Sequence, residues 1–322
     1  MRVVAFDSVW PQDLRPLLRP DVELESVRRD DAGASDAALA DAEVLISVVF
    51  DRRMAGLAGK LKLLVCPAAG SEHIDRDAIP SGVRMVNGLG HETAIAEHVF
   101  GALVSLRRRF QAVDAALRRG EWIAGFHAPE SLTTELAGSN LGLLGFGRIG
   151  QAIARRAHAF EMSCAALTMH PDKQSAAAAT LAWTGHLGDP GDVDRLLAWA
   201  DAVVLCCELS AHTRGLVDAR RFGLMRPSAL LVNVARGPIA VESDLFDALR
   251  DRRIAGAALD VWYRYPHRRD ERTAPSRFPF HELDNVLMTP HSSGWTTGNK
   301  QRRLHWMAGL INDLAAGVTP AR

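Results

Sequence analysis

The stretch Leu141-Gly142-Leu143-Leu144-Gly145-Phe146-Gly147-Arg148-Ile149-Gly150 decides the fold. Its apolar start, Leu141–Leu144, predicts a buried strand, and the pattern G-x-G-x-x-G follows at once and opens a helix over Ile149–Phe160. In this context Gly145 permits a tight turn, Gly147 lets a diphosphate approach the backbone, and Gly150 lets the helix pack closely on the strand. Because a helix N-terminus offers unpaired N–H groups to phosphates, we predict a dinucleotide site on this turn.

Short apolar runs alternate with helical segments on both sides of the glycine-rich turn. Strands are predicted at Val3–Phe6, Val44–Val49, Leu63–Cys66, Arg84–Val86, Ser163–Leu167, Asp201–Cys206, Ala229–Val234, Gly256–Leu259 and Asn285–Met288. One long helix is predicted from Ala94 to Arg119, and another over Gln301–Ala316. Strands that alternate with helices predict parallel sheets with right-handed crossovers, and 322 residues predict two domains.

The composition is that of a globular protein that binds small molecules. The formal net charge is zero, from 38 basic and 38 acidic side chains, which argues against a nucleic-acid or membrane-surface partner. The four cysteines lack C-x-x-C spacing, so we expect no metal site and reduced thiols. The first residues read as a strand and no apolar run approaches the roughly 18 residues that span a bilayer. We therefore expect a cytoplasmic location.

The strand after the glycine-rich helix bears on the choice of dinucleotide. It leads to Thr168, where a carboxylate would ordinarily bind the ribose hydroxyls of NAD. The missing carboxylate removes repulsion against the 2′-phosphate of NADP, which His170 or Lys173 could reach, but no arginine follows Thr168 directly. The choice between NAD and NADP therefore stays open.

Three later segments are predicted to end strands at the ligand-binding edge of the sheet: Asn233–Gly237, Ala257–Val261 and Thr289–Trp295. Hydride transfer to a 2-oxo acid needs a cation that holds the carboxylate and polarises the carbonyl, and a proton donor that works near neutral pH. Arg236 could supply the first and His291 the second. Taken singly, each could instead be a surface ion-pair partner or a structural histidine, but their joint position downstream of the glycine-rich turn favours the catalytic interpretation.

Here the sequence resembles the D-isomer-specific 2-hydroxyacid dehydrogenase family over nearly its whole length. The motifs are Ala68–Asp75, Ala96-Glu97-His98, Gly145–Gly150, Asn233–Gly237, Asp260-Val261 and Thr289–His291. The resemblance implies a Rossmann-type, doubly wound parallel sheet for the cofactor at residues 94–291. It also implies a smaller, flavodoxin-like α/β substrate domain from residues 1–93 and 292–322. A homodimer and a small anionic substrate are further implications.

The resemblance also assigns roles to residues. Arg236 would bind and polarise the substrate, His291 would exchange the proton, Asp260 would orient the nicotinamide, and backbone amides around Ala69 and Gly70 would grip the acid group. Cofactor contacts would fall on Gly145, Gly147, Arg148, Ile149, Gly150, Thr168, Cys207, Thr213, Val234, Ala235, Arg236, Asp260, His291 and Gly294. Trp295 would either wall the substrate pocket or be a core aromatic at the domain junction.

The sequence departs from the family at three places. Tyr265 stands where the family usually has a glutamate paired to the catalytic histidine, so the imidazolium is expected to be less stable and proton donation at neutral pH weaker, although the hydroxyl could still fix the ring's tautomer. Glu208 replaces a common proline near the adenine site, and Glu72 replaces a more usual aspartate. The segment Arg264–Arg277, rich in arginine and proline, is expected to be either a solvated surface loop or an electropositive lid.

These features predict an oxidoreductase that transfers hydride between NAD or NADP and a small 2-oxo acid or D-2-hydroxy acid. Oxidation of a small anion, as in formate or phosphite dehydrogenases, is an alternative that Tyr265 would hinder less. A dinucleotide-sensing, corepressor-like binding protein is a third hypothesis. The presence of both Arg236 and His291 speaks against it, because a binding protein needs no such pair.

Overall fold

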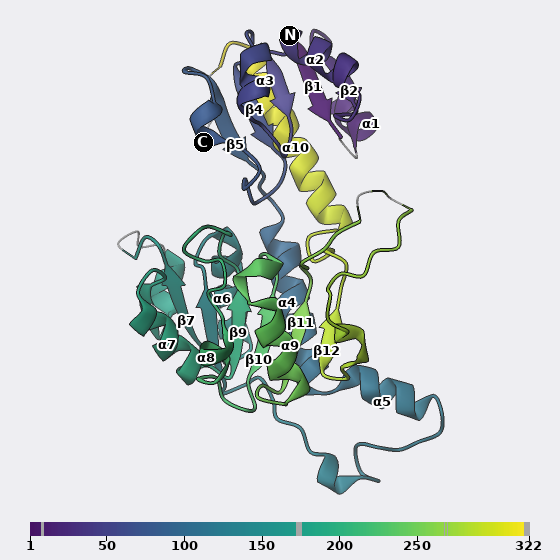
Figure 1. Cartoon of the computed structure of the whole chain (residues 1–322), viewed down its shortest axis with the longest axis vertical. Helices are drawn as coiled ribbons and strands as arrows, with labels where there is room; N and C mark the ends of the chain where they lie inside the picture. Colours follow the sequence, from purple (N-terminus) through teal and green to yellow (C-terminus); the bar gives the residue numbers. More distant parts are fainter. Residues whose placement is uncertain (8–9, 172–175, 267, 269, 319–322) are drawn as a thin grey trace. The chain divides into compact units, whose positions relative to one another are not determined.

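The computed structural model describes residues 1–7, 10–171, 176–266, 268 and 270–318 (Figure 1). The chain divides into two compact units, each with its own parallel sheet. The first unit comprises Met1–His91 and Thr296–Arg322, and the second comprises Glu92–Trp295. The roles that the sequence assigns to the two domains stay predictions at this point.

The first unit is built on a five-stranded parallel sheet in the order β2-β1-β3-β4-β5, which is the flavodoxin-like winding. Helix α10 packs on one face through Leu304, Met307 and Ile311, and helices α2 and α3 cover the other. The strands are β1 Arg2–Phe6, β2 Glu23–Val27, β3 Val44–Ile46, β4 Leu63–Cys66 and β5 Arg84–Asn87. The helices are α1 Pro11–Leu14, α2 Ala32–Asp41, α3 Arg52–Leu57 and α10 Thr297–Ala315, with 3-10 turns at Arg15–Leu17 and Arg76–Ala78.

The second unit is built on a seven-stranded parallel sheet in the order β12-β11-β10-β9-β6-β7-β8. The strands are β6 Asn140–Leu144, β7 Ser163–Thr168, β8 Trp183–His186, β9 Ala202–Leu205, β10 Leu230–Asn233, β11 Gly256–Leu259 and β12 Val286–Met288. The winding reverses between β6 and β9, as in a Rossmann-type sheet. Ligands of such sheets bind beyond the carboxyl ends of the strands beside that reversal. The predicted fold class is therefore confirmed for both units.

Helices cover both faces of the second sheet, which explains why its inner strands are almost wholly apolar. Side chains of α4 and α6 form one core layer with the sheet, and those of α7, α8 and α9 form the other. The helices are α4 Glu92–Arg107, α5 Phe110–Leu117, α6 Arg148–Ala159, α7 Pro190–Trp199, α8 Ala219–Phe222 and α9 Glu242–Arg250. Short 3-10 helices lie at Pro129–Ser131, Ala176–Thr180, Gly237–Ile239 and Phe280–Glu282.

Two predicted helices have different bounds in the structure. The single helix predicted from Ala94 to Arg119 is wrong, because Arg109 adopts a left-handed conformation (φ 54°) and separates α4 from α5. The C-terminal helix begins at Thr297, earlier than predicted, because Thr296 caps it by accepting the amide of Asn299 at 3.2 Å.

Several strands also differ from the prediction. The strand predicted over Val44–Val49 ends at Ile46, where the chain leaves the sheet. Edge strands β2 and β8 were not predicted, since their side chains are mostly exposed or half-buried and give no apolar run.

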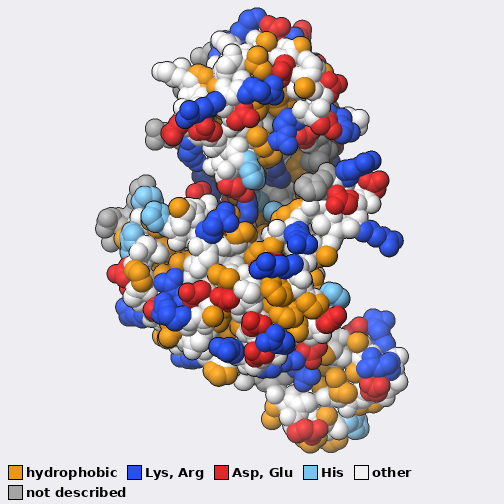
Figure 2. Space-filling view, viewed as in Figure 1, with side chains coloured by type: hydrophobic (Ala, Val, Ile, Leu, Met, Phe, Trp, Pro, Cys, Tyr) orange, Lys and Arg blue, Asp and Glu red, His pale blue; other side chains and the backbone are white. Residues whose placement is uncertain are grey.

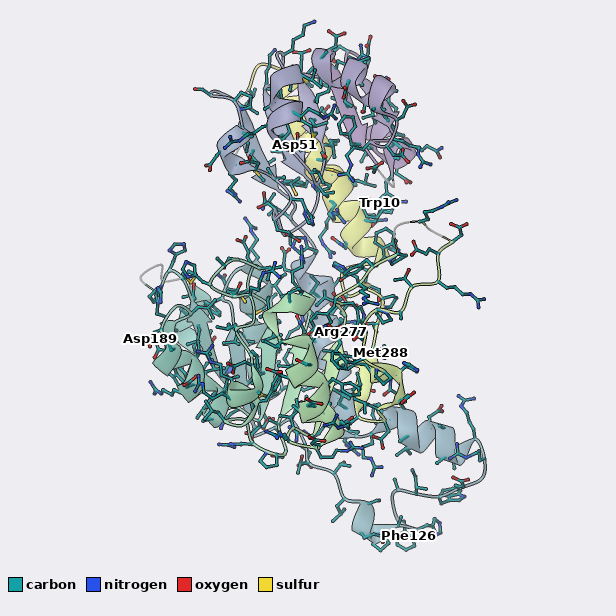
Figure 3. All side chains as sticks on the ribbon, in the orientation of Figure 1. Trp10, Asp51, Phe126, Asp189, Arg277 and Met288 are labelled. Atoms are coloured by element: carbon teal, nitrogen blue, oxygen red, sulfur yellow. The ribbon has the colours of Figure 1, made fainter. Side chains whose placement is uncertain are left out.

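The chain from α5 to Leu132 extends away from the sheet of the second unit, and we call residues 110–132 the arm (Figures 1 and 2). Large apolar side chains are exposed along it, including Phe126 at 95% and Leu132 at 92%. Figure 3 places Phe126 at the far end of the arm.

Among all the helices of the described residues, none combines the length and the apolar character that would let it cross a membrane.

Candidate active site

The glycine-rich turn joins β6 to α6 with the geometry that the sequence predicts. Gly145 has φ 118°, and a Cβ there would lie 2.6 Å from the amide nitrogen of Cys207, so the fold itself requires glycine. A Cβ on Gly150 would press on the carbonyl oxygen of Gly145, so Gly150 sets the close packing of helix on turn. A Cβ on Gly147 would meet nothing within 4 Å. Folding therefore does not need a glycine at position 147, and the space outside it is open to a ligand.

The N-terminus of α6 is open as well. Gly147 is the N-cap residue, and no side chain caps the first turn of this 12-residue helix. Its unpaired amides and the positive end of its dipole therefore face outward, which suits a phosphate. Behind the turn, the thiol of Cys206 donates to the carbonyl of Gly145 at 3.1 Å, and burial raises the pKa of that thiol well above its usual 9.0. Cys206 thus fastens the turn as a protonated donor.

The loops after β7 and β9 carry the next group of predicted cofactor contacts. Thr168 ends β7 and accepts the amide of His170 at 3.2 Å, while Lys173 lies outside the described residues. Thr213 is buried, and its hydroxyl donates to the carbonyl of Glu208 at 2.6 Å, which fixes the loop after β9. Cys207 in that loop is half-buried, and burial raises its pKa to about 12. These two loops flank the glycine-rich turn, because β7 and β9 both pair with β6.

Arg236, Asp260 and His291 follow three neighbouring strands, β10, β11 and β12, at their carboxyl ends. The loop after β11 lies between the other two and binds both. Trp262 in this middle loop donates its indole N–H to the carbonyl of Thr289 at 2.8 Å. The structure therefore brings together in one unit the two residues that the sequence singled out for chemistry.

Asp260 is 1% exposed and organises the loop that carries His291. Its Oδ1 accepts the hydroxyl of Thr289 at 2.7 Å and the amide of Ser292 at 2.8 Å, and its Oδ2 accepts the amide of Ser293 at 2.9 Å. Burial alone would raise the pKa of Asp260, but the hydrogen bonds from Ser293, Thr289 and Ser292 outweigh it and hold the pKa below 3.8. The group is thus an ionised, buried carboxylate.

His291 occupies a left-handed backbone conformation (φ 56°), which is uncommon for a residue other than glycine. Its amide donates to the backbone carbonyl of Asp260 at 2.7 Å, so the same residue that holds the flanking loop also holds His291. The exposed imidazole lies beside Tyr265, with ring centroids 5.7 Å apart at 54°. The hydroxyl of Tyr265 accepts the amide of Trp262 at 3.0 Å.

Arg236 is positioned by the turn that follows β10. Buried Asn233 accepts the amide of Ala235 at 3.1 Å and donates to the carbonyl of Arg236 at 3.0 Å, which closes a short turn. The guanidinium donates to the carbonyl of Ala235 at 2.6 Å. Val234 and Ala235, both predicted cofactor contacts, are buried beside it.

The remaining predicted contacts lie on separate parts of the chain. Arg148 and Ile149 begin α6, and Gly294 and Trp295 follow His291 in sequence. The side chain of Trp295 is 62% exposed, whereas a core aromatic would be buried. Ala69 and Gly70 lie in the first unit, in the loop after β4.

The sequence assigned no role to the residues that hold the site together: Asn233, Trp262 and Thr289, with His98 on α4 placing Nε2 3.5 Å from the hydroxyl of Thr289. Asn233, Thr289 and His98 lie within the quoted motifs, and that position was the only signal the sequence offered.

One hollow of the second unit lies away from this edge. Its volume is about 510 Å³, and it is lined by Leu230 and Gly256, which begin their strands, and by Arg107, Arg109 and Asn285. It therefore lies at the amino ends of the strands, opposite the edge where ligands of such sheets bind. We place the candidate site at the carboxyl ends, on the geometry of the glycine-rich turn and of the Arg236 and His291 loops.

Comparison with known proteins identifies the family of the chain. Residues 100–293 match the family described as D-isomer specific 2-hydroxyacid dehydrogenase, NAD binding domain. The chain is 31% identical to a glyoxylate reductase of Thermococcus litoralis over 93% of this chain and 85% of that one. It is 30% identical to a formate dehydrogenase of Neurospora crassa over 88% and 76%. Its fold resembles an acyclic imino acid reductase in complex with NADPH and D-Arg, with a TM-score of 0.82, 23% identity and coverage of 99% and 98%.

Asp260→Asn is predicted to loosen the His291 loop, because an amide NH₂ would then face a backbone N–H. We expect the free energy of unfolding at pH 7 to fall by about 2–4 kcal/mol, and the amides of Ser292 and Ser293 to lose protection from hydrogen exchange. Folding lowers the pKa of Asp260 below 3.8, so this contribution is present above about pH 4 and is lost as the pH falls further.

The matched control is Asp244→Asn, since Asp244 accepts the amide of Ala219 at 2.8 Å on the surface. We expect it to cost at most about 1 kcal/mol. An Asp260→Asn chain as stable and as protected as the wild type would contradict the role given to Asp260.

Proposed function

Because the chain belongs to the D-isomer-specific 2-hydroxyacid dehydrogenase family, we propose that it transfers hydride between NAD or NADP and a small 2-oxo acid or D-2-hydroxy acid. The observation that carries this proposal is the joint placement of Arg236 and His291 after neighbouring strands, in the same unit as an open glycine-rich turn. A dinucleotide-binding protein without turnover would need the turn but not the other two residues.

The residues of the glycine-rich turn fit a dinucleotide. The space beyond Gly147 is open, the N-terminus of α6 has no side-chain cap, and the loops after β7 and β9 flank it. We assign the diphosphate to this turn and the adenosine to the loops that carry Thr168, Cys207 and Thr213. When bound, the nicotinamide supplies or accepts the hydride. The absence of a carboxylate at Thr168 leaves both NAD and NADP admissible.

In the proposed reaction Arg236 binds the substrate acid and polarises its carbonyl, since a guanidinium can form two parallel hydrogen bonds to planar oxygen groups. His291 gives a proton to the carbonyl oxygen during reduction and takes it back during oxidation. Asp260 keeps His291 in place, and its Oδ2, which accepts the amide of Ser293, would retain acceptor capacity for the amide of a bound nicotinamide. The amides around Ala69 and Gly70 bind the acid group.

Oxidation of a small anion is the second candidate, and Tyr265 is the observation that favours it. The ring of Tyr265 lies beside His291, and a phenol thus takes the place of the carboxylate that relatives usually carry at this position. A reaction that transfers hydride without a proton would be unaffected by this change. For reduction of a 2-oxo acid, the same change predicts a pH optimum below that of relatives with the glutamate.

The two reactions are separated by assays with purified protein. We expect NADH or NADPH to be oxidised with a panel of small 2-oxo acids, and Arg236→Ala to lower kcat/KM at least 100-fold while the Kd of the dinucleotide changes less than threefold. Reduction of NAD or NADP by formate or phosphite, without activity on any 2-oxo acid, would support the second candidate. Dinucleotide binding with no turnover on either panel would leave only the sensing hypothesis.

Gly147 and Gly150 give a sharp test of the cofactor site. Gly147→Ala is expected to keep the wild-type Tm, because the added Cβ meets open space in the protein. It is expected to raise the Kd of the dinucleotide at least tenfold, because the diphosphate would occupy that space. Gly150→Ala is expected to lower the Tm by several degrees, because its Cβ meets the carbonyl of Gly145. A Gly147→Ala protein that binds dinucleotide like the wild type would refute the assignment.

We further propose that the protein is a homodimer in the cytoplasm, with the arm as its interface. The arm exposes Phe110, Leu117, Trp122, Ile123, Phe126 and Leu132 within a single segment of 23 residues, 110–132. An apolar surface of this kind is typical of a protein–protein contact, and a second copy offers the same surface in return. The hollow beside Arg109 and Leu132 lies next to the arm and would be covered with it.

The dimer is tested by sedimentation velocity. The double change Phe126→Ser and Leu132→Ser is predicted to convert the dimer to monomer at micromolar concentration, since it removes the two most exposed apolar side chains of the arm. Leu224→Ser, which alters an exposed leucine of the second unit away from the arm, is the control and is expected to leave a dimer. A monomeric wild type, or a dimeric double variant, would overturn the proposal.

A further inference from the structure

The loop after β4 in the first unit has an unusual backbone arrangement: each of four consecutive carbonyls is bound by a donor from within the unit. The guanidinium of Arg303 donates to Pro67. The amide of Gly88 donates to Ala68 at 3.0 Å, the side chain of Asn87 to Ala69 at 3.3 Å, and the thiol of Cys66 to Gly70 at 3.5 Å. We call residues 67–70 the acid loop.

This arrangement determines where the amides of the acid loop point. In a trans peptide the N–H lies opposite the preceding C=O, so carbonyls held by internal donors turn the following amides away from those donors. Within the described part of the first unit, the amides of Ala69 and Gly70 donate no hydrogen bond. Successive outward amides form a concave, partly positive surface that binds anions. The acid loop is thus prepared for a carboxylate before any substrate arrives.

Arg303 is the only charged donor among these four, and its setting is costly. It projects from α10, with its guanidinium carbon 5.0 Å from the ring centre of Trp10, which Figure 3 shows beside that helix. Its Nε is buried and, among the described residues, has no hydrogen-bond partner. No carboxylate among the described residues pairs with it, and burial lowers the pKa of its guanidinium. An arginine nevertheless stays protonated in proteins, so a half-buried cation without a carboxylate partner among the described residues lies behind the acid loop.

The neighbouring cations of α10 do not share this position. Lys300 pairs with Asp13 at 2.8 Å, and Arg302 donates through Nε to the carbonyl of Gly90 at 2.8 Å, outside the acid loop. A purely structural need for a donor to Pro67 could be met by a neutral side chain, at a smaller desolvation cost.

We infer that Arg303 is a positioning residue for the substrate acid group: it holds the Pro67 carbonyl and so fixes the start of the acid loop, and its charge favours an anion at the amides of Ala69 and Gly70. This inference rests on the proposed function, which assigns the acid group to those amides. Arg303 acts through the acid loop and does not itself touch the substrate. Its loss therefore weakens binding of the acid more than it slows the chemical step.

The test compares Arg303→Met and Arg303→Lys with the control Arg302→Met, which removes the adjacent arginine of the same helix. We expect Arg303→Met to raise the KM for a 2-oxo acid at least tenfold, with kcat lowered less than threefold and the Kd of the dinucleotide unchanged within twofold. Arg303→Lys, which keeps the charge and one donor, is expected to fall between it and the wild type. Arg302→Met is expected to keep the wild-type KM.

Two further measurements keep the result interpretable. Ethylguanidinium added to Arg303→Ala is expected to restore part of the affinity, which a merely structural defect would not show. Thermal shift with oxalate in the presence of NADH or NADPH reports acid binding without turnover, so it tests Arg303 even if no 2-oxo acid is reduced and the proposed function fails. A folded Arg303→Met protein with wild-type KM and oxalate affinity, or rescue by no guanidinium and no lysine, would overturn the inference.

Discussion

The buried carboxylate of Asp260 is the constraint on which the candidate site depends. An ionised group at 1% exposure is tolerated only because a hydroxyl and two amides of the loop after β12 bind it. Those bonds shape the loop, and the backbone carbonyl of the same residue holds His291 in its left-handed conformation. The hydrogen bonds that stabilise the buried charge of Asp260 therefore also fix the position of the exposed imidazole of His291. The neighbouring strands β10, β11 and β12 bring the loops of Arg236, Asp260 and His291 to one edge of the sheet.

Internal hydrogen bonds also fix the backbone at two other loops, the glycine-rich turn and the acid loop. At the glycine-rich turn the backbone is held by the thiol of Cys206 and by close packing at Gly145 and Gly150, so that the amides at the start of α6 stay open. At the acid loop, four internal donors bind the carbonyls and leave the amides of Ala69 and Gly70 outward. In both cases donors of the protein itself bind carbonyls of the loop, and the amides remain for an anion.

Much of the fold could be predicted from the sequence, because fully buried parallel strands such as Ala202–Leu205 are continuous apolar runs and the glycine spacing identifies its own turn. Edge strands β2 and β8 could not, since one or both faces meet solvent and the apolar run disappears. The break at Arg109 lacks a glycine or proline signal. Arg236 and His291 were found by position and chemistry. No role could be assigned from the sequence to Trp262, Thr289 or Arg303, because each acts through a partner that the fold brings from 27 to 236 residues away.

The central claim, hydride transfer between a nicotinamide and the C2 carbon of a small acid, is tested most directly with cofactor deuterated at the transferring position. Mass spectrometry of the product formed from an unlabelled 2-oxo acid would locate the label. One deuterium is expected at C2 of a D-2-hydroxy acid, and the labelled product is expected to form at least 100-fold more slowly when Arg236 is replaced by alanine. A product without deuterium, or label that passes only to or from formate or phosphite, would contradict it.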